Sequence, residues 1–318
     1  MKYVSALTYL VISMTLFTAL ESRADGDTTI TSNITTSAPS PDFSPLAPLG
    51  PSTTAGTGST LERISVDGNE ISYVFHAFSG LKGKAPTVIV LHGQNGNGEQ
   101  MERVTGMSQL ADTSKFIVAY PDQTNVTSVK ALISTLIASH NADPARIYVT
   151  GISHGGINTQ QVGCQLSSQI AGIASISAGL PVPLEEHCDL VRPFPVILIH
   201  GTQDPIVPYN GGVPHTPNAQ GHNYRLLSEP NTFDFWRDHN GCTGQAAVTK
   251  VSGTDGTVTR TTVSGCVNDA KVALYTVTGG GHTWPGGSTE QQRYASILGP
   301  LNTKFDASQA IWNFFSGR

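Results

Sequence analysis

A serine flanked by glycines lies between a predicted strand and a predicted helix. The stretch RIYVTGISHGG places Ser153 in a G-x-S-x-G pattern that runs from Gly151 to Gly155. In a strand–turn–helix setting this pattern forms a nucleophile elbow, where a larger residue at either glycine would clash with the neighbouring strand and helix. The sequence therefore predicts Ser153 as a nucleophile for acyl transfer.

Two further residues could activate this serine. A serine hydroxyl is a poor nucleophile until a base takes its proton, and a carboxylate orients that base. Asp204 follows the apolar run VILIHG, and His282 lies in the glycine-rich stretch GGGHTWPGG after the run VALYTVTG. The order serine, aspartate, histidine is one of the known orders of a catalytic triad. The alternatives are an Asp-Pro turn at Asp204 and a solvent-exposed loop histidine at His282.

Backbone N–H groups near the serine could hold the negative oxygen that forms during acyl transfer. We expect one from His154, the residue after the nucleophile, and one from Gln94 in the loop LHGQNGNG, where Gly93 helps the chain to turn inward. Each such donor typically contributes about 3 kcal/mol of transition-state stabilisation. A glycine-rich phosphate cradle is the alternative for this loop, but the phosphate-binding glycine patterns are missing from the sequence.

Three other side chains near these loops have expected roles. Trp284 lies two residues after His282, so we expect an exposed ring that forms a wall of the substrate pocket. A plug in a small core is the alternative for this residue. His92 and His200 each end an apolar run before a glycine, and we expect them to hold the loops by structural hydrogen bonds.

Strands that alternate with helices must position these loops. Apolar runs predict strands at 87–93, 115–121, 146–151, 171–179, 194–201 and 271–279, and a hairpin at 63–77 turns at Asp67-Gly68. Helices are predicted at 127–140, behind a Thr or Ser cap, and at 156–169, 230–241 and 306–315. The fold class is therefore α/β, with a mostly parallel sheet, helices on both faces and an N-terminal antiparallel hairpin. The loops at the carboxyl ends of the strands should meet at one edge.

Composition and charge divide the 318 residues and limit the partners. Residues 1–24 contain Lys2, an apolar run and a small-residue cleavage pattern, as in a secretory signal peptide. Two thirds of residues 25–60 are Ser, Thr, Pro or Gly, which predicts a disordered linker, and 61–318 form the catalytic domain. A net charge of −5 gives no basic surface for nucleic acid and no polybasic membrane patch. We expect a secreted protein without stable membrane insertion.

The four cysteines agree with export. An even number in an exported chain predicts disulfides, and four cysteines allow three connectivities. They fall into two close pairs, Cys164 with Cys188 and Cys242 with Cys266. A zinc site is the alternative, but neither pair has C-x2-C spacing, so no metal is expected.

Four stretches carry a family resemblance: RIYVTGISHGG, PVILIHGTQDPIVPYNGG, FWRDHNGC and GGGHTWPGG. From about residue 61 to 318 the sequence resembles the secreted α/β-hydrolases of the polyhydroxybutyrate depolymerase-like esterase family. That family overlaps the feruloyl and acetylxylan esterases of carbohydrate esterase family one. The resemblance implies an α/β-hydrolase fold and a serine esterase with Ser153, Asp204 and His282 as its triad. It also supports the two cysteine pairs.

The segment PDQTNVTSVKALI departs from this family, because it is short and lacks the tryptophan and the acidic pair that usually precede the helix. The sequence therefore leaves open which acyl group and which polymer the substrate contains. We expect a carboxylesterase that cleaves polyhydroxyalkanoate-type polyester, or feruloyl or acetyl esters of plant polysaccharide, through an acyl-enzyme and without a cofactor. The alternatives are an acyltransferase with the same triad and a non-catalytic polymer-binding protein.

Overall fold

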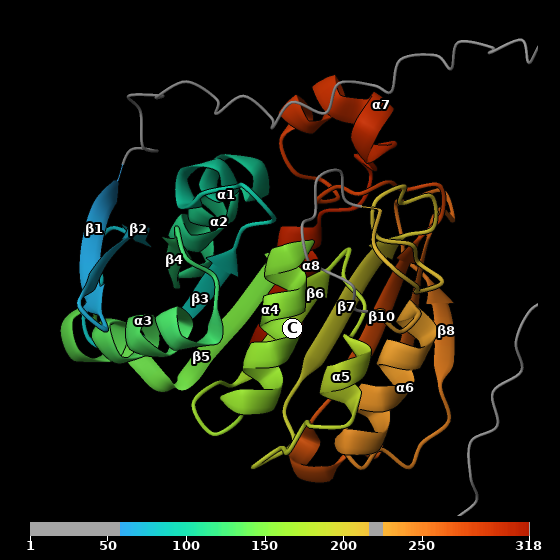
Figure 1. The fold of residues 1–318 in the computed structure, drawn as a ribbon, viewed down its shortest axis with the longest axis horizontal. Coiled ribbons are helices and arrows are strands. Elements are labelled where there is room, and N and C mark those ends of the chain that lie inside the picture. The colour runs from blue at the N-terminus through green and yellow to red at the C-terminus, as the bar shows by residue number, and fades with distance from the viewer. Residues whose placement is uncertain (1–57, 216–224, 318) are drawn as a thin grey trace, which may run out of the picture. The chain divides into compact units, whose positions relative to one another are not determined.

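The computed structural model describes residues 58–215 and 225–317, which all lie in the unit Phe43–Arg318. Their strands form one ten-stranded sheet in the order β1-β2-β4-β3-β5-β6-β7-β10-β9-β8 (Figure 1). The strands are β1 (Ser59–Val66), β2 (Asn69–Ala77), β3 (Ala85–Leu91), β4 (Ile117–Pro121), β5 (Ala142–Ile152), β6 (Gly172–Ile176), β7 (Val196–Gly201), β8 (Ala247–Lys250), β9 (Val258–Val263) and β10 (Val272–Val277). The signal peptide and almost all of the linker lie outside the described residues.

The first two strands form the predicted hairpin. Strand β1 pairs antiparallel with β2, and the two residues between them, Asp67 and Gly68, have φ values of 50° and 80°. Positive φ at both central residues is the conformation that the right-handed twist of a hairpin favours. The Asp-Gly pair therefore sets the register of this edge of the sheet.

The centre of the sheet is parallel. Neighbours from β4 through β3, β5, β6 and β7 to β10 all pair in parallel, whereas β2, β9 and β8 add antiparallel pairs at the two sides. This arrangement confirms the predicted fold class. The antiparallel strands β8 and β9 were not expected, because every residue of β8 is exposed and gives no apolar pattern.

Helices cover both faces of the sheet. They are α1 (Gly98–Thr105), α2 (Met107–Ser114), α3 (Val126–Ser139), α4 (His154–Gln165), α5 (Val182–Glu185), α6 (Glu229–His239), α7 (Ala295–Leu298) and α8 (Ala307–Ser316), with 3-10 turns at Val267–Asp269 and Thr289–Tyr294. Apolar residues of α3, α4 and α6 share one core with the sheet, and those of α2 and α8 share the other (Figure 1). Alternate residues of each central strand enter opposite cores, as a sheet buried on both faces requires.

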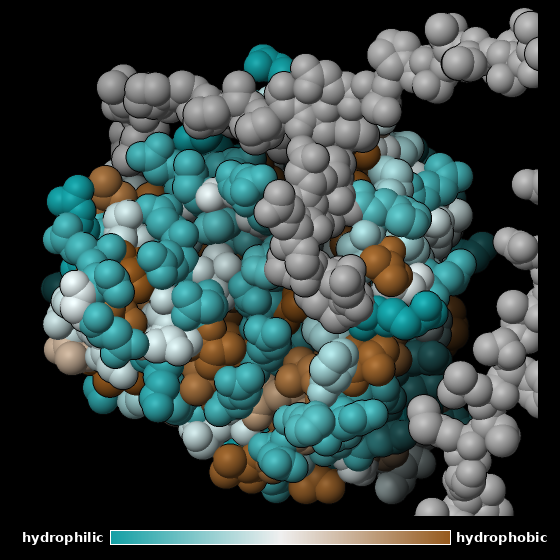
Figure 2. All heavy atoms as spheres, in the orientation of Figure 1, coloured by the Kyte–Doolittle hydropathy of each residue, from teal (hydrophilic) through white to brown (hydrophobic). Residues whose placement is uncertain are grey.

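Large apolar side chains are scattered on the surface. Figure 2 shows small hydrophobic patches among mostly hydrophilic residues on the face that it draws. The exposed large apolar residues are Leu61, Val191, Val213, Val248, Val267 and Ile297. Within the described part of the chain, no helix has both the length and the apolar character that a membrane crossing needs.

One predicted helix begins with a different cap. We expected Thr or Ser to cap the helix at 127–140, but α3 begins one residue earlier and its N-cap is Asn125, whose side chain accepts a hydrogen bond from the Ser128 N–H. That expectation is wrong because asparagine caps a helix as well as serine does, and Asn125 lies two residues before Thr127.

Both cysteine pairs are disulfides. Cys164 in α4 bonds to Cys188 after α5, and Cys242 after α6 bonds to Cys266 after β9. The predicted pairing is confirmed. The first bridge ties down the helix that follows Ser153.

Candidate active site

Ser153 lies in a strained turn at the carboxyl end of β5. Its φ is 59° and its ψ is −126°, a combination that is rare for a residue with a side chain. It immediately precedes α4, which begins at His154. The turn therefore holds the serine side chain at the N-terminal end of a helix, where negative charge is favoured.

The two glycines of the elbow are required by close approach. A Cβ on Gly151 would lie 2.5 Å from the backbone oxygen of Gly155. A Cβ on Gly155 would come much closer than 3.0 Å to the carbonyl oxygens of Leu91 and His92. Real Cβ atoms do not approach backbone so closely, so the sharp turn depends on both glycines.

The loop after β3 contacts the serine. A Cβ on Gly93 would lie 3.2 Å from the Cβ of Ser153, so this loop runs directly beside the elbow. The ring of His92 holds the loop, because its nitrogens lie 2.7 Å from the carbonyl oxygen of Gly93 and 3.1 Å from that of Asp122. These bonds match the structural role expected for His92. Gln94 follows Gly93 and is exposed beside the elbow, where an oxyanion donor would be needed.

His282 and Asp204 meet at the same edge of the sheet. They come from the loops after β10 and β7, two strands that pair in parallel. The Nδ1 of His282 lies 2.7 Å from the Oδ2 of Asp204, and both side chains are buried. Because an ionised carboxylate accepts hydrogen bonds only, Nδ1 carries the hydrogen and Nε2 is the basic nitrogen.

Backbone groups fix the other oxygen of Asp204. Its Oδ1 accepts hydrogen bonds from the N–H groups of Ile206, at 2.9 Å, and Val207, at 2.8 Å. Asp204 therefore forms the Asp-Pro turn that was its alternative role, and it also contacts His282. Burial alone would raise the pKa of the Asp204 carboxyl, but the charges and hydrogen bonds of His282 and His200 hold this pKa well below its usual range. Asp204 is therefore a carboxylate at neutral pH.

The glycines around His282 allow a tightly packed loop. A Cβ on Gly281 would clash with the backbone of Leu298 and Gly299, and one on Gly287 would clash with the backbone oxygen of Val104. Gly286 has a φ of 71°. The stretch GGGHTWPGG thus packs closely between other segments of backbone, and it places His282 at the edge of the sheet where Ser153 and Asp204 lie.

Trp284 is not exposed. Its side chain is fully buried in the core on the α8 side of the sheet, and its Nε1–H donates a hydrogen bond to Ser308 Oγ at 3.0 Å. The expectation of an exposed pocket wall is wrong, and the alternative of a core plug describes the residue. The close backbone packing around the loop turns the ring inward, which proximity to His282 in sequence could not indicate.

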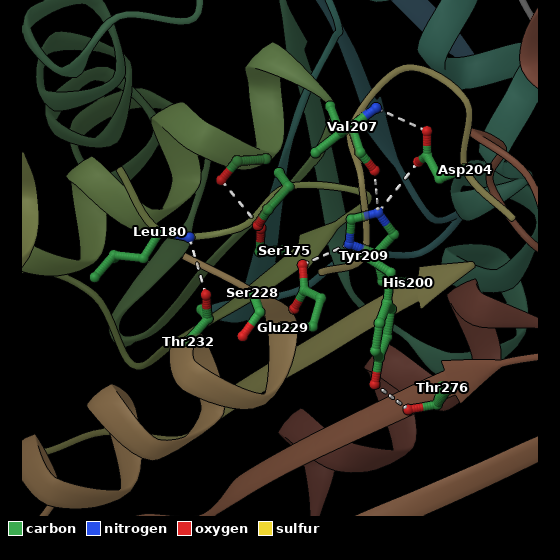
Figure 3. A network of polar contacts seen from close by, with 12 residues as sticks. Ser175, Leu180, His200, Asp204, Val207, Tyr209, Ser228, Glu229, Thr232 and Thr276 are labelled. Carbon is green, nitrogen blue, oxygen red and sulfur yellow. Dashed lines mark hydrogen bonds and ion pairs between the residues drawn. The ribbon is translucent and has the colours of Figure 1, made fainter. Parts of the chain in front are cut away.

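His200 has more partners than a structural hydrogen bond requires. It lies on β7 with its ring between two carboxylates, at 2.6 Å from Glu229 Oε1 and 3.2 Å from Asp204 Oδ2 (Figure 3). Its Nε2 also lies 2.9 Å from the carbonyl oxygen of Val207. Sequence reasoning missed Glu229, the first residue of α6, because no local pattern connects it to His200. The four-residue spacing of His200 and Asp204 was the available signal.

Comparisons with known proteins show similarity to esterases and carboxylesterases. A family model described as phospholipase/carboxylesterase matches residues 119–221. The "Putative esterase NocK" of Nocardia uniformis is 28% identical over 83% of this chain and 84% of its own length. The acetyl xylan esterase of Aspergillus awamori has the same fold, with a TM-score of 0.52 and 13% identity over 75% of this chain and 98% of its own. The chain has the α/β-hydrolase fold and is similar to esterases.

Other relatives of this α/β-hydrolase are longer proteins. Feruloyl esterase B of Piromyces equi is 31% identical over 64% of this chain, which spans 40% of that protein. Poly(3-hydroxyalkanoate) depolymerase C of Paucimonas lemoignei is 31% identical over 33% of this chain and 30% of its own length. The predicted family resemblance, fold and ester-hydrolase class are confirmed for the α/β-hydrolase, whereas the roles of single residues stay predictions.

Proposed function

We propose that the protein is a secreted serine carboxylesterase that uses Ser153, Asp204 and His282 to hydrolyse esters of a polymer or its oligomers. The observation that carries the proposal is the buried contact between His282 Nδ1 and Asp204 Oδ2 at 2.7 Å, at the sheet edge where the strained Ser153 turn also lies. Secretion is supported by the apolar N-terminal segment and by the two disulfides.

Hydrolysis proceeds in two steps. Ser153 Oγ attacks the ester carbonyl while His282 Nε2 takes the serine proton, and the N–H groups of Gln94 and His154 receive the oxyanion. The imidazolium then protonates the departing alcohol, which leaves an acyl-enzyme on Ser153. Water repeats the sequence from the same base and releases the acid. Asp204 keeps the hydrogen on Nδ1 and stabilises the imidazolium throughout.

The substrate class rests on the relatives. Their names give feruloyl esters, acetylated xylan and poly(3-hydroxyalkanoate), and the last two are polymers that contain ester bonds. We expect one of these to be the natural substrate. Parallel incubation of the mature protein with feruloylated arabinoxylan, acetylated xylan and polyhydroxybutyrate, with specific activities compared, identifies the substrate. Activity on a soluble p-nitrophenyl ester with none on any of the three would contradict the polymer assignment.

Substitution of the triad tests the mechanism. Ser153→Ala should lower turnover of a p-nitrophenyl ester by roughly three or more orders of magnitude while the protein folds normally, because a triad acts as a unit. His282→Ala should cost about as much, and Asp204→Asn somewhat less, because nucleophile and base both remain. Residual activity should exceed the uncatalysed rate through the oxyanion donors.

A serine-directed phosphonate gives an independent readout. It should label Ser153 stoichiometrically in the wild type and abolish hydrolysis. The mechanism fails if Ser153→Ala stays active, and the carboxylate assignment fails if Asp204→Asn is harmless while Asp234→Asn or Asp238→Asn is inactive. Transfer of the acyl group to a sugar, with little free acid formed, would identify an acyltransferase instead.

A further inference from the structure

A buried ion pair stands behind the carboxylate of Asp204. The side chain of His200 has 0% exposure and that of Glu229 has 2%, and the Asp204 side chain is also fully buried. Isolated buried charges are strongly unfavourable, so such groups occur where they neutralise one another. Three titratable side chains are thus in contact away from solvent, and the two-step mechanism above gives a role to Asp204 but none to His200 or Glu229.

The contacts of His200 fix its state of protonation. One ring nitrogen faces the Glu229 carboxylate, and the other faces the Asp204 carboxylate and the Val207 carbonyl oxygen (Figure 3). All of these partners are acceptors, so both ring nitrogens must donate and the ring is an imidazolium. Burial alone would lower the pKa of His200, but the charges and hydrogen bonds of Glu229 and Asp204 outweigh burial and raise this pKa to about 10.

The position of His200 is itself rigid. It lies within strand β7, and Glu229 is held at the start of α6 by its own N–H, which donates to the Tyr209 carbonyl oxygen at 3.0 Å. The ring of Tyr209 stands edge-on to that of His200, at 5.7 Å between centroids, and its hydroxyl bonds to Thr276 on β10 (Figure 3). Strand, helix and neighbouring ring thus keep the imidazolium beside Asp204.

Both histidines use the same oxygen. His282 Nδ1 lies 2.7 Å and His200 Nε2 lies 3.2 Å from Asp204 Oδ2, while Oδ1 is occupied by the backbone N–H groups of Ile206 and Val207. The imidazolium of His200 therefore shares the negative charge that orients His282. A carboxylate with its full charge would favour the protonated form of His282, which cannot act as a base.

We propose that His200, held as an imidazolium by Glu229, is a positioning residue. It orients Asp204 Oδ2 toward His282 and partly neutralises the negative charge of the Asp204 carboxylate beside His282. This inference rests on the proposed triad. Its consequence is an esterase that keeps its base neutral, and so stays active, at a lower pH than a lone aspartate would permit. Among the described residues, the titratable side chains in contact with His200 are Asp204, Glu229 and Tyr209, and the one in contact with His282 is Asp204.

The double variant His200→Gln with Glu229→Gln tests the inference. It removes both charges together, so neither is left unpaired, and glutamine at 200 keeps an N–H donor for Asp204. The acid limb of the kcat/KM profile for a p-nitrophenyl ester should move to higher pH by about 0.5 to 1 unit, since a cation close to the carboxylate is lost. The plateau kcat should fall about tenfold, with KM within about twofold, as positioning acts on the transition state. An unmoved acid limb in a folded, active double variant would overturn the inference.

Asp112→Asn is the matched control. His76 is another buried histidine with a carboxylate partner, with its Nε2 at 3.1 Å from Asp112 Oδ1, but it lies on β2, and four strands separate β2 from β7 in the sheet. This variant damages a histidine–carboxylate pair remote from the triad whose carboxylate is half exposed, so we expect at most a small loss of thermal stability with the acid limb in place. A shift as large as that of the double variant would assign the effect to general destabilisation and reject the inference.

If the double variant does not fold, a second measurement on the wild-type protein still tests the inference. In wild-type protein with 15N-labelled histidine at pH 8, one buried ring should carry hydrogen on both nitrogens, and its contact with the Tyr209 ring identifies it as His200. A neutral His200 ring at pH 8 would overturn the proposal. Phosphonate labelling of wild-type Ser153 and the inactivity of Ser153→Ala separate the outcomes: if both hold and the acid limb does not move, only the role of His200 is wrong.

Discussion

The two oxygens of Asp204 have different tasks. Oδ1 accepts from two backbone N–H groups of its own loop, and Oδ2 faces two histidine rings. The backbone bonds hold Oδ1 and the His200 contact holds Oδ2, so the carboxylate is oriented without help from solvent. Asp204→Asn would place an N–H donor against an N–H donor at one of these contacts, which explains why a substitution of the same shape should still lower activity.

Gly155→Ala tests the steric demand of the elbow. The new Cβ would overlap the carbonyl oxygens of Leu91 and His92, and both belong to rigid backbone at the end of β3. We expect a loss of at least about 2 kcal/mol in the free energy of unfolding and a large loss of ester turnover, because overpacking displaces Ser153. Urea unfolding and initial rates measure the two effects.

Gly253→Ala is the control for backbone strain alone. Gly253 has a φ of 78°, and a Cβ there would meet nothing within 4 Å. It should cost about 1 kcal/mol with turnover unchanged. Gly155 has no positive φ, so its substitution adds only the close approach to backbone. Equal effects of the two substitutions would show that this close approach costs no more than a strained φ.

At the residue scale, the placement of the candidate residues was predictable where residue types and order indicate it, whereas their catalytic roles stay predictions. Ser153, Asp204 and His282 are marked by a glycine-flanked serine and by loops that follow apolar strands, and the structure places them at one edge of the sheet. The partner of His200 was not predictable, because Glu229 is 29 residues away and enters from the start of a helix. Trp284 was misplaced for a similar reason, since its burial depends on Ser308 in α8.

At the scale of elements, each disulfide closes a loop with a sequence separation of 24 residues. Replacing Cys242 and Cys266 together by alanine should lower the free energy of unfolding by about 3 kcal/mol on the chain-entropy model. Because this bridge joins the end of α6 to the turn after β9, ester turnover of the folded variant should stay near that of the wild type. Urea unfolding under non-reducing conditions measures the loss. A loss below about 1 kcal/mol would contradict the entropic account.

Replacing Cys164 and Cys188 by alanine is the comparison for that experiment. The Cys164–Cys188 bridge has the same sequence separation, so the loss in the free energy of unfolding should be similar. However, this bridge anchors the helix that begins right after Ser153. We expect turnover to fall further here than in the Cys242 and Cys266 variant. Equal turnover in the two would mean that the elbow does not depend on the far end of α4.

Long apolar elements were predictable, and short ones were not. The central strands and the helices α3, α4, α6 and α8 have apolar runs or faces that local sequence displays. Helices α1 and α2 have eight residues each and are separated by Gly106, with a φ of 63°, so neither holds enough turns to show a periodic face. Strand β8 exists through its pairing with β9, which is a tertiary effect.

At the scale of the whole molecule, truncated chains test the predicted N-terminal boundary of the catalytic domain. Strand β1 begins at Ser59, two residues before the predicted boundary, and Ser59 Oγ bonds to the buried His76 Nδ1 at 2.9 Å and to Glu102. A chain that begins at Gly58 should match the stability and turnover of one that begins at Asp25, because the composition of 25–57 predicts no core contacts.

A chain that begins at Leu61 should unfold at a lower temperature than one that begins at Gly58. It removes the Ser59 partner of the buried His76 Nδ1 and leaves Glu102 Oε1 with Ser108 alone. We expect a loss of about 1 to 3 kcal/mol, and each kcal/mol lowers Tm by roughly 2 to 4 °C at this size. Differential scanning calorimetry gives the comparison. Equal Tm values for the Gly58 and Leu61 chains would show that Ser59 adds nothing, and a lower Tm for the Gly58 chain than for the Asp25 chain would show that 25–57 pack on the domain.

The edge position of β1 bears on how the enzyme could be attached to a solid support. Neighbouring strands lie about 4.8 Å apart, so β1 stands about 19 Å along the sheet from β5, which ends at Ser153, and about 29 Å from β7, which precedes Asp204. A bead, resin or fusion carrier joined ahead of Gly58 would connect to the sheet at an edge remote from both strands. Immobilisation through this end should leave insoluble polymer free to reach the serine, whereas coupling through the exposed Thr202 or Gln203 after β7 should block it.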